Sequence, residues 1–205
     1  MVDHQIRSRG IRDSRLLHVL HSIPRHLFVP SAYAPEAYED HPVDIGHGQT
    51  VSQPYMVAWM TEALELRGGE RVLEVGTGSG YQTAVLAKLA AEVYTIERIP
   101  VLARRAQETL DRLGLRNIHF RIGDGTLGVP DAAPFDGILV TAGAPAIPQA
   151  LKDQLADGGR LAMPVGGRAG QDLMLLVRRG AAVIEKSLGG CVFVRLIGEQ
   201  GWPEA

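Results

Sequence analysis

Three glycines and a carboxylate stand close together in the run VLEVGTGSGY, at Gly76, Gly78, Gly80 and Glu74. Glycine permits positive φ and close approach of the backbone to a ligand, so a strand that turns into a helix here can form a binding turn. A tight turn without a ligand is the simpler interpretation of the glycines alone. The acidic residue before them adds a group that can meet a cation, such as an ammonium group.

The spacing of the glycines separates two classes of ligand. A dinucleotide fingerprint requires G-x-G-x-x-G, so that a pyrophosphate sits on the helix N-terminus. Here the spacing is G-x-G-x-G, and Tyr81 stands where that pattern has its last glycine. S-adenosylmethionine has no pyrophosphate, and its ammonium group needs a carboxylate such as Glu74. The run therefore favours a methyl donor over NAD or a flavin.

Two further acidic residues follow apolar runs. Glu97 ends VYTIE, where a carboxylate can accept from both ribose hydroxyls, a feature shared with NAD enzymes. Asp124 follows IHFRI and can accept from an adenine amino group, while Gly125 lets the backbone approach the ring. Each acid alone also fits a solvated strand end. Together, three carboxylates on three successive strands predict a pocket for adenosine and an ammonium group.

Apolar runs that alternate with helical stretches must position these residues. The predicted strands are 71–75, 93–96, 118–122, 137–140 and 160–164, and the predicted helices between them are 81–90, 100–113 and 147–155. Crossover helices of this kind join parallel strands. The pattern predicts a doubly wound α/β fold with a mostly parallel, Rossmann-like sheet.

The two ends of the chain flank that sheet. Residues 173–178 and 192–197 have short connections and should pair antiparallel at one edge. Helices are expected at 13–20 and 54–66, so that the first ~50 residues form a cap over the carboxyl end of the sheet, where ligands bind in open α/β folds. We expect one domain, with the cap and active-site loop at 1–53, the cofactor-binding core at 54–165 and the C-terminal strands at 166–205.

Composition narrows the functional classes. The 205 residues are 45% hydrophobic and 21% charged, which is the balance of one globular domain. A net charge of -2 leaves no positive excess for a polyanion, which argues against nucleic acid as a partner. The chain shows neither the apolar stretch of a secretory signal nor the ~18 apolar residues of a membrane span. We therefore expect a cytoplasmic location and no membrane partner.

Cysteine and histidine give no sign of a metal site. The single cysteine, Cys191, fits a reducing cytosol and is expected to be a small buried apolar residue. His18 and His21 lie one helical turn apart, but no third ligand stands at a recognised spacing. We expect solvated helix positions for both histidines and no bound metal.

The motif GQTVSQPYM at 48–56 is the most specific one in the chain. With VLEVGTGSGYQTAVLA, VYTIER, GDG, PFDGILVTAGAPAIP and LADGGRLAMPVG, it makes almost the whole chain resemble the protein-L-isoaspartate (D-aspartate) O-methyltransferases, which have the class I methyltransferase fold. The resemblance implies S-adenosylmethionine as the methyl donor and places the active-site hydroxyl on Ser52. It also implies that the donor is contacted by Thr50, Val51, Ser79, Glu97, Arg98, Asp124 and Gly125. The chain departs from the family pattern at 44–47 and matches it only loosely at 194–202.

Ser52 also has a purely structural interpretation. Ser-Gln-Pro is good chemistry for the start of a helix, and a serine hydroxyl can cap free main-chain amides. The two roles can coexist.

The resemblance implies methylation of the α-carboxylate of L-isoaspartyl and D-aspartyl residues in damaged proteins and peptides. In the family, the methyl ester then cyclises without the enzyme to a succinimide, whose hydrolysis returns some normal aspartate. A methyltransferase for a small molecule or RNA is the nearest alternative, because the fold hosts many acceptors. The glycine spacing opposes an NAD-dependent oxidoreductase, and the hydroxyl-bearing loop opposes a sensing module without catalysis.

Overall fold

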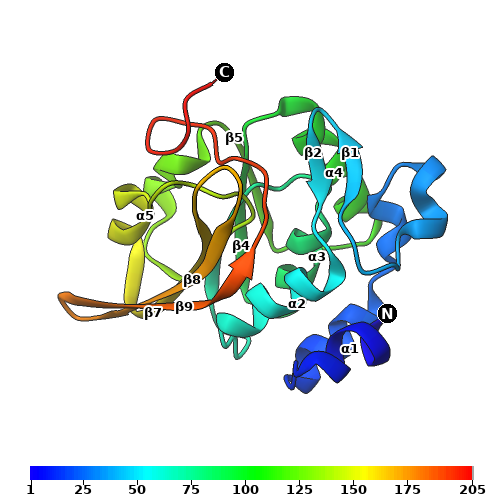
Figure 1. Cartoon of the computed structure of the whole chain (residues 1–205), viewed down its shortest axis with the longest axis horizontal. Coiled ribbons are helices and arrows are strands. Elements are labelled where there is room, and N and C mark those ends of the chain that lie inside the picture. Colours follow the sequence, from blue (N-terminus) through cyan, green and yellow to red (C-terminus); the bar gives the residue numbers. More distant parts are fainter. Residues whose placement is uncertain (205) are drawn as a thin grey trace.

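A seven-stranded sheet forms the centre of the computed structural model, which describes residues 1–204 (Figure 1). Its strands, in the spatial order β5-β4-β3-β6-β7-β8-β9, are β3 (Arg71–Val75), β4 (Glu92–Glu97), β5 (Ile118–Ile122), β6 (Phe135–Val140), β7 (Leu155–Gly166), β8 (Gln171–Arg179) and β9 (Ala182–Cys191). Neighbours from β5 to β7 pair parallel, and β8 and β9 add antiparallel. The predicted doubly wound fold with an antiparallel edge is confirmed.

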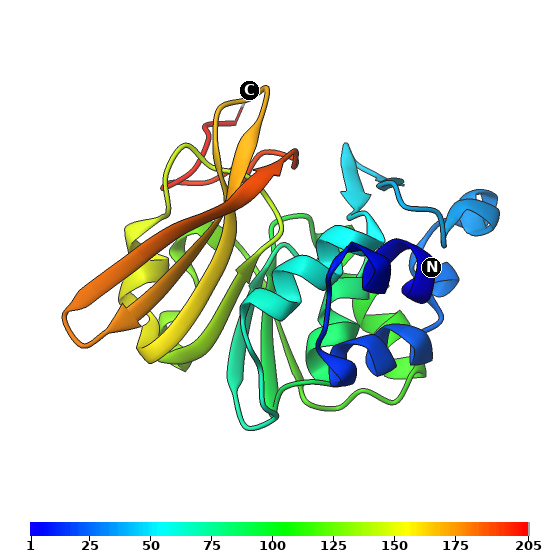
Figure 2. The same ribbon diagram turned by 60° about the horizontal axis from the view of Figure 1, so that its bottom comes forward.

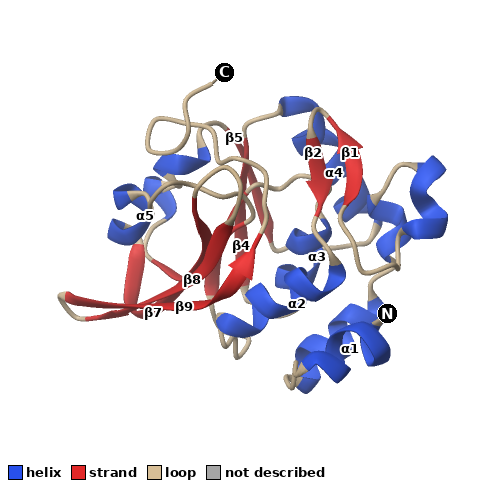
Figure 3. Cartoon of the chain, in the orientation of Figure 1, coloured by secondary structure: helices blue, strands red, loops and turns tan. Residues whose placement is uncertain are grey.

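Helices cover both faces of the sheet (Figure 3). The helices are α1 (Ser14–Ser22), α2 (Pro54–Ala63), α3 (Tyr81–Ala87), α4 (Pro100–Arg112) and α5 (Gln149–Asp153), with short helical turns at Val2–Ile6, Arg7–Arg9, Arg25–Phe28, Ser31–Glu36, Gly125–Leu127 and Pro130–Ala132. One apolar cluster packs the four helices α1, α2, α3 and α4 against one face of the sheet. A second cluster packs α5 against the other face. Within residues 1–204, no helix is long and apolar enough to cross a lipid bilayer.

The order of the strands reverses beside β3. From β3 the chain proceeds outward to β4 and β5, and then returns to place β6 on the other side of β3. Side chains along β3 alternate between the two apolar clusters, with Val72 in one and Leu73 and Val75 in the other. Open α/β sheets bind ligands outside the carboxyl ends of their strands at such a switch point. The fold therefore creates a crevice between the ends of β3 and β6.

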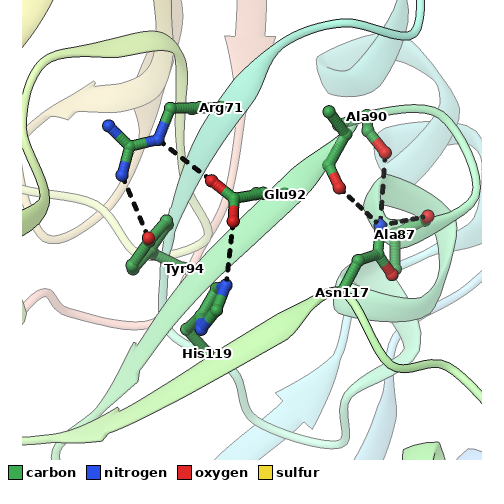
Figure 4. A network of polar contacts seen from close by, with 8 residues as sticks. Arg71, Ala87, Ala90, Glu92, Tyr94, Asn117 and His119 are labelled. Carbon is green, nitrogen blue, oxygen red and sulfur yellow. Dashed lines mark hydrogen bonds and ion pairs between the residues drawn. The ribbon is translucent and has the colours of Figure 1, made fainter.

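A polar network fixes the register of β3, β4 and β5 (Figure 4). Arg71 Nε donates to Glu92 Oε2 at 3.2 Å, and Arg71 Nη2 donates to the Tyr94 hydroxyl at 3.0 Å. His119 stacks on the Tyr94 ring with centroids 4.4 Å apart, and its Nε2 lies 3.4 Å from Glu92 Oε1. Nearby, Asn117 Nδ2 donates to three main-chain carbonyls at the end of α3. These contacts hold the strands in the register that aligns their carboxyl ends.

Helix α1 does not lie over the carboxyl end of the sheet, contrary to our expectation for the N-terminal cap. Its buried residues pack on α2 and α3 instead (Figure 2). Arg15 donates to the carbonyls of Leu66 and Leu89, which come just before β3 and β4 begin. Only the antiparallel hairpin of β1 (Val43–Gly46) and β2 (Gln49–Val51) reaches the carboxyl end. The apolar face of α1 explains its place, because α2 and α3 offer it an apolar surface.

The prediction of a strand at 192–197 is wrong. The last strand of the sheet is β9, and residues 192–197 form an extended strap that crosses the carboxyl end, with isolated bridges between Gly143 and Arg195 and between Ile197 and Trp202. The sequence AVIEKSLGGC of β9 does not stand out as a strand because Glu185, Lys186 and Ser187 interrupt its apolar residues and two glycines follow. An edge strand pairs with a neighbouring strand on one side only, and edge strands commonly carry charged side chains.

Gly80 serves helix packing and does not line the predicted ligand pocket. It precedes α3 with φ +86°, and a Cβ there would lie 3.1 Å from both Ala106 Cβ and Leu110 Cδ1 of α4. The third glycine of the run therefore lets α3 and α4 approach each other. The packing against α4 is enough to explain the glycine, and its predicted contact with a cofactor stays a prediction.

We expect Gly80→Ala to lower the free energy of unfolding by about 1–3 kcal/mol more than Gly114→Ala, because overpacking adds to the strain of positive φ. Gly114 is the matched control, since its φ is +73° and a Cβ there would meet nothing within 4 Å. Urea unfolding of both variants gives the comparison. Equal losses would show that backbone strain, and not contact with α4, explains Gly80.

Candidate active site

A cavity opens at the carboxyl ends of β3, β4 and β6, at the switch point of the sheet. We call it the first cavity. Most of the predicted site residues line it, namely Thr50, Val51, Ser52, Gly76, Gly78, Ser79, Glu97, Arg98 and Gly125. Glu74, Gly80 and Asp124 do not. The structure thus brings together residues from the hairpin of β1 and β2, from the turn at 76–80, which we call the glycine turn, and from the ends of three strands.

The glycine turn is held against the end of β6 by Thr141. The Thr141 hydroxyl donates to Gly76 O at 2.8 Å and lies 3.1 Å from Val75 O. A Cβ on Gly76 would lie 2.3 Å from Thr141 Oγ1, and the φ of Gly76 is +95°. Both the close approach and the positive φ require glycine at this position.

Glu97 presents a carboxylate that the main chain holds in place. Its Oε2 accepts from the Gly78 amide at 2.9 Å, and its Oε1 accepts from the Ile99 amide at 2.9 Å. The residue is only 6% exposed and lines the first cavity. Each carboxylate oxygen can accept a further hydrogen bond. The side chain is therefore preorganised to accept from a pair of hydroxyls.

Gly125 lines the cavity, whereas the neighbouring Asp124 carboxylate turns away from it. A Cβ on Gly125 would lie 2.5 Å from Val75 Cγ1, so only glycine fits. Asp124 accepts from the Thr126 amide and hydroxyl at 2.8 and 2.7 Å, and from the Glu199 amide at 2.8 Å. Burial alone would raise the pKa of Asp124, but these hydrogen bonds hold it below its ordinary value. In this structure Asp124 anchors the C-terminal segment, and its contact with adenine stays a prediction.

Glu74 is a wholly buried carboxyl group and does not reach the cavity. It lies on the face of β3 that α3 covers, where its Oε2 accepts from Thr83 at 2.5 Å and from Thr95 at 2.6 Å. Within the described residues, its Oε1 has no hydrogen-bond partner. Burial raises the pKa of Glu74 to about 8, although the two hydroxyls oppose this. Glu74 thus has no direct access to the first cavity, and its contact with an ammonium group stays a prediction.

Thr95 extends the buried contacts of Glu74 toward the cavity. The hydroxyls of Thr95 and Thr77 lie 2.6 Å apart, and Thr77 lines the first cavity. A neutral carboxyl group is compatible with partners that both donate and accept. Glu74 thus supports the glycine turn from below.

Ser52 lies where the first cavity meets a second one. The second cavity is lined by Pro42, Thr50, Ser52, Gln53, Met56, Thr141, Val192, Phe193 and Val194. Thr50, Ser52, Thr141 and Val194 belong to both cavities. A side chain of Ser52 can therefore reach ligands on either side.

The capping role considered for Ser52 belongs to Asp40. Helix α2 has Gln53 at its N-cap with no side-chain cap bond, and the Tyr55 amide donates to Asp40 Oδ1 at 3.1 Å. Within residues 1–204, the Ser52 side chain makes none of the hydrogen bonds found, and only its carbonyl accepts, from Arg25. The hydroxyl of Ser52 is therefore left for a ligand.

Some residues of the site were missed by the sequence analysis. Thr141 follows a predicted strand just as Glu97 does, so the same rule of polar strand ends applies to it. Thr77, Gln82 and the strap at 194–197 also line the first cavity. The strap carried no motif, because its place depends on contacts such as Gly143 N to Val194 O at 2.7 Å, far apart in the sequence.

Glu74→Gln should remove a dependence of stability on pH. A buried acid with pKa about 8, against an ordinary value of 4.5, holds a proton that the unfolded chain releases. Its stabilisation is complete below pH ~4.5 and is lost as pH rises through about 8, so wild-type stability should fall across this window. We expect the stability of Glu74→Gln relative to wild type to rise by a few kcal/mol from pH 5 to 8. Urea unfolding measures it.

Glu108→Gln is the control, because Glu108 is exposed on α4. Its stability relative to wild type should stay constant over the same range. A constant difference for Glu74→Gln as well would mean that Glu74 is ionised throughout.

Comparison with known proteins agrees with this geometry. The sequence model of the family described as protein-L-isoaspartate(D-aspartate) O-methyltransferase matches residues 1–201. Protein-L-isoaspartate O-methyltransferase 1 of Syntrophobacter fumaroxidans is 57% identical over 202 residues, covering 98% of this chain and 94% of that protein.

Solved structures give the same relationship. A protein-L-isoaspartate O-methyltransferase superposes with a TM-score of 0.84 at 30% identity, covering 95% of this chain, which spans 64% of that chain's length. A Plasmodium falciparum structure described as a protein-L-isoaspartate O-methyltransferase in complex with S-adenosyl-L-homocysteine gives a TM-score of 0.81 at 27% identity, covering 93% of this chain and 94% of that chain. From the match over residues 1–201 and these relatives, the chain belongs to the protein-L-isoaspartate (D-aspartate) O-methyltransferase family.

Proposed function

We propose that this protein transfers a methyl group from S-adenosylmethionine to the α-carboxylate of L-isoaspartyl and D-aspartyl residues in damaged proteins, which starts their repair. The observation that carries the proposal is the free hydroxyl of Ser52 at the meeting point of two cavities. A methyl transferase with two substrates needs one site for each and a junction where they react. The names of the relatives support the same activity.

The first cavity suits the methyl donor. Glu97, fixed by two main-chain amides, fits the two ribose hydroxyls, and Val75 and Ile96, which line the same cavity beside Gly125, offer apolar side chains against which a flat ring can pack. We propose that the donor is held by Thr50, Val51, Gly76, Gly78, Ser79, Glu97, Arg98 and Gly125. When bound, S-adenosylmethionine supplies an electrophilic methyl group on a sulfonium sulfur. The related structure from Plasmodium falciparum was solved with S-adenosyl-L-homocysteine, which supports a donor of this class.

The second cavity suits the acceptor peptide. Pro42, Met56, Val192 and Phe193 give it apolar walls, which strip water from a carboxylate and raise its reactivity. Ser52 would donate a hydrogen bond that holds this carboxylate at the junction. The carboxylate is already deprotonated at neutral pH, so the site needs no strong general base. Alignment by Ser52 and exclusion of water then supply the rate.

The proposal also covers the partners of the protein, its location in the cell and the organisation of its domain. We propose that the partners are proteins and peptides that contain isoaspartate, since the lining residues of the second cavity within 1–204 include no Lys or Arg that could bind the phosphates of a nucleic acid. A cytoplasmic location fits the single cysteine, Cys191, which is half-buried and has a pKa raised to about 11 by burial. We also propose that 1–53, 54–165 and 166–205 work as parts of one domain, because all three contribute to the walls of the first cavity.

The direct test compares an isoaspartyl peptide with the same peptide carrying normal aspartate. We expect at least ~100-fold higher kcat/KM for the isoaspartyl peptide, about 2.7 kcal/mol in transition-state binding. The two peptides have equal charge and composition, but isomerisation moves the free carboxylate onto a shorter arm. A labelled-methyl assay on short unstructured peptides measures the ratio. Equal rates, or methylation only of an RNA or a metabolite, would overturn the proposal.

Ser52→Ala should lower kcat for the isoaspartyl peptide while leaving the affinity for S-adenosylhomocysteine and the free energy of unfolding nearly unchanged. The reason is that the hydroxyl acts on the acceptor and does not cap α2. Turnover, calorimetric affinity and urea unfolding should be measured on one preparation. Unchanged turnover with reduced stability would assign Ser52 a structural role instead.

A further inference from the structure

We propose that Arg25 and Asp40 are positioning residues that grip the chain at and just after Ser52 and thereby set the rate of methyl transfer. The inference rests on the proposed role of Ser52. Both residues lie in the N-terminal segment, outside the walls of the first cavity. They act through the loop between β2 and α2, and neither is expected to touch a substrate.

Arg25 is a fully buried cation that joins two loops. Its Nε donates to Ala37 O at 2.7 Å, and its Nη2 donates to Ser52 O at 2.8 Å. The guanidinium also lies over the Tyr81 ring, 4.6 Å from its centre. Burial of a cation is costly unless its surroundings compensate it. A neutral side chain could fill the same space, so the pair of hydrogen bonds to the carbonyls of Ala37 and Ser52 is the feature that calls for arginine.

Asp40 accepts hydrogen bonds from Gln53 and Tyr55, which follow Ser52 in the chain. Its Oδ2 accepts from Gln53 Nε2 at 2.7 Å, and its Oδ1 accepts from the Tyr55 amide at 3.1 Å. Arg9 Nη1 donates to the same carboxylate at 2.7 Å. The aspartate thus fixes the start of α2 directly after Ser52. Together with Arg25, it attaches the carbonyl of Ser52 and the first turn of α2 that follows it.

These attachments leave the Ser52 hydroxyl free while fixing the backbone that carries it. In-line displacement depends on the alignment of the reacting groups, and a misplacement of about 1 Å can cost ~100-fold in rate. Most residues of the proposed donor site, such as Gly76 and Glu97, are held by other contacts, and Thr50 and Val51 lie on β2, before the segment that Asp40 holds. Loss of the grip should therefore lower kcat much more than it weakens donor binding.

Glu62 provides a matched control on the same helix. Its Oε1 accepts from the Arg12 and Asp13 amides at 2.6 and 2.9 Å, so it also ties the N-terminal segment to α2. It lies near the end of α2, whereas Asp40 caps the start. Asp40→Ala and Glu62→Ala each remove hydrogen bonds between the N-terminal segment and the region of α2, but only Asp40 holds the residues beside Ser52.

The experiment measures kcat for an isoaspartyl peptide, the Kd of S-adenosylhomocysteine and urea unfolding for Asp40→Ala, Asp40→Asn and Glu62→Ala in the full chain. We expect Asp40→Ala to lower kcat at least ~10-fold, with Kd changed less than ~3-fold. Asp40→Asn should restore kcat to within ~3-fold of wild type, because asparagine caps helices as well as aspartate and Gln53 can turn its amide to pair with it. Glu62→Ala should keep kcat within ~2-fold, whatever its stability.

Hydrogen exchange gives a readout that is independent of activity. Amides of the segment 53–57 should exchange faster in Asp40→Ala than in wild type, and at the wild-type rate in Asp40→Asn. Arg25→Lys, which keeps the charge but cannot reach both carbonyls in the same fork, should also lower kcat more than it changes Kd.

Two outcomes would overturn the inference. One is an equal loss of kcat in Asp40→Ala and Glu62→Ala, which would assign both residues to stability alone. The other is unchanged kcat and unchanged exchange in Asp40→Ala. If wild type fails to methylate the peptide, the proposed function fails, and the exchange of 53–57 still decides whether Asp40 holds the loop.

Discussion

The site depends on the close contact between Gly76 and Thr141 where β3 and β6 end. The Thr141 hydroxyl reaches over the turn to Gly76 O, and no side chain fits at position 76. This contact fixes the first glycine of the turn exactly at the reversal of strand order, so the crevice of the fold opens beside it. Gly78 can then present its amide to Glu97. The ligand pocket thus follows from one tight approach of backbone and side chain.

The chain divides helix capping and the proposed role in catalysis between Asp40 and Ser52, two residues that are twelve positions apart. A serine before a helix ordinarily satisfies the free amides of the first turn. Here Asp40 does so from a distant loop, and Arg25 holds the Ser52 carbonyl. The serine hydroxyl is therefore not consumed by local structure. A group that must bind a substrate benefits when its neighbours satisfy the backbone.

The sequence predicted the parallel strands, most of the helices and most of the cavity wall, because buried strands read as continuous apolar runs and functional turns need glycine. It misplaced residues whose surroundings are set by distant partners. Glu74 faces Thr83 under α3 since side chains alternate along β3, and Asp124 accepts a hydrogen bond from the main-chain amide of Glu199, which is 75 positions away. It also missed β9, an exposed edge strand that lacks the continuous apolar run of a central strand.

The two carboxyl groups nearest the glycine turn show why residue type alone could not assign the site. Glu97 is held by two main-chain amides, which only donate and so suit a carboxylate. Glu74 is held by two hydroxyls, which can also accept, and it lies in a wholly buried place that favours the neutral acid. The sheet supplies both positions. What distinguishes a ligand-binding acid from a supporting one is the kind of donor around it, and that depends on which face of the strand each residue occupies.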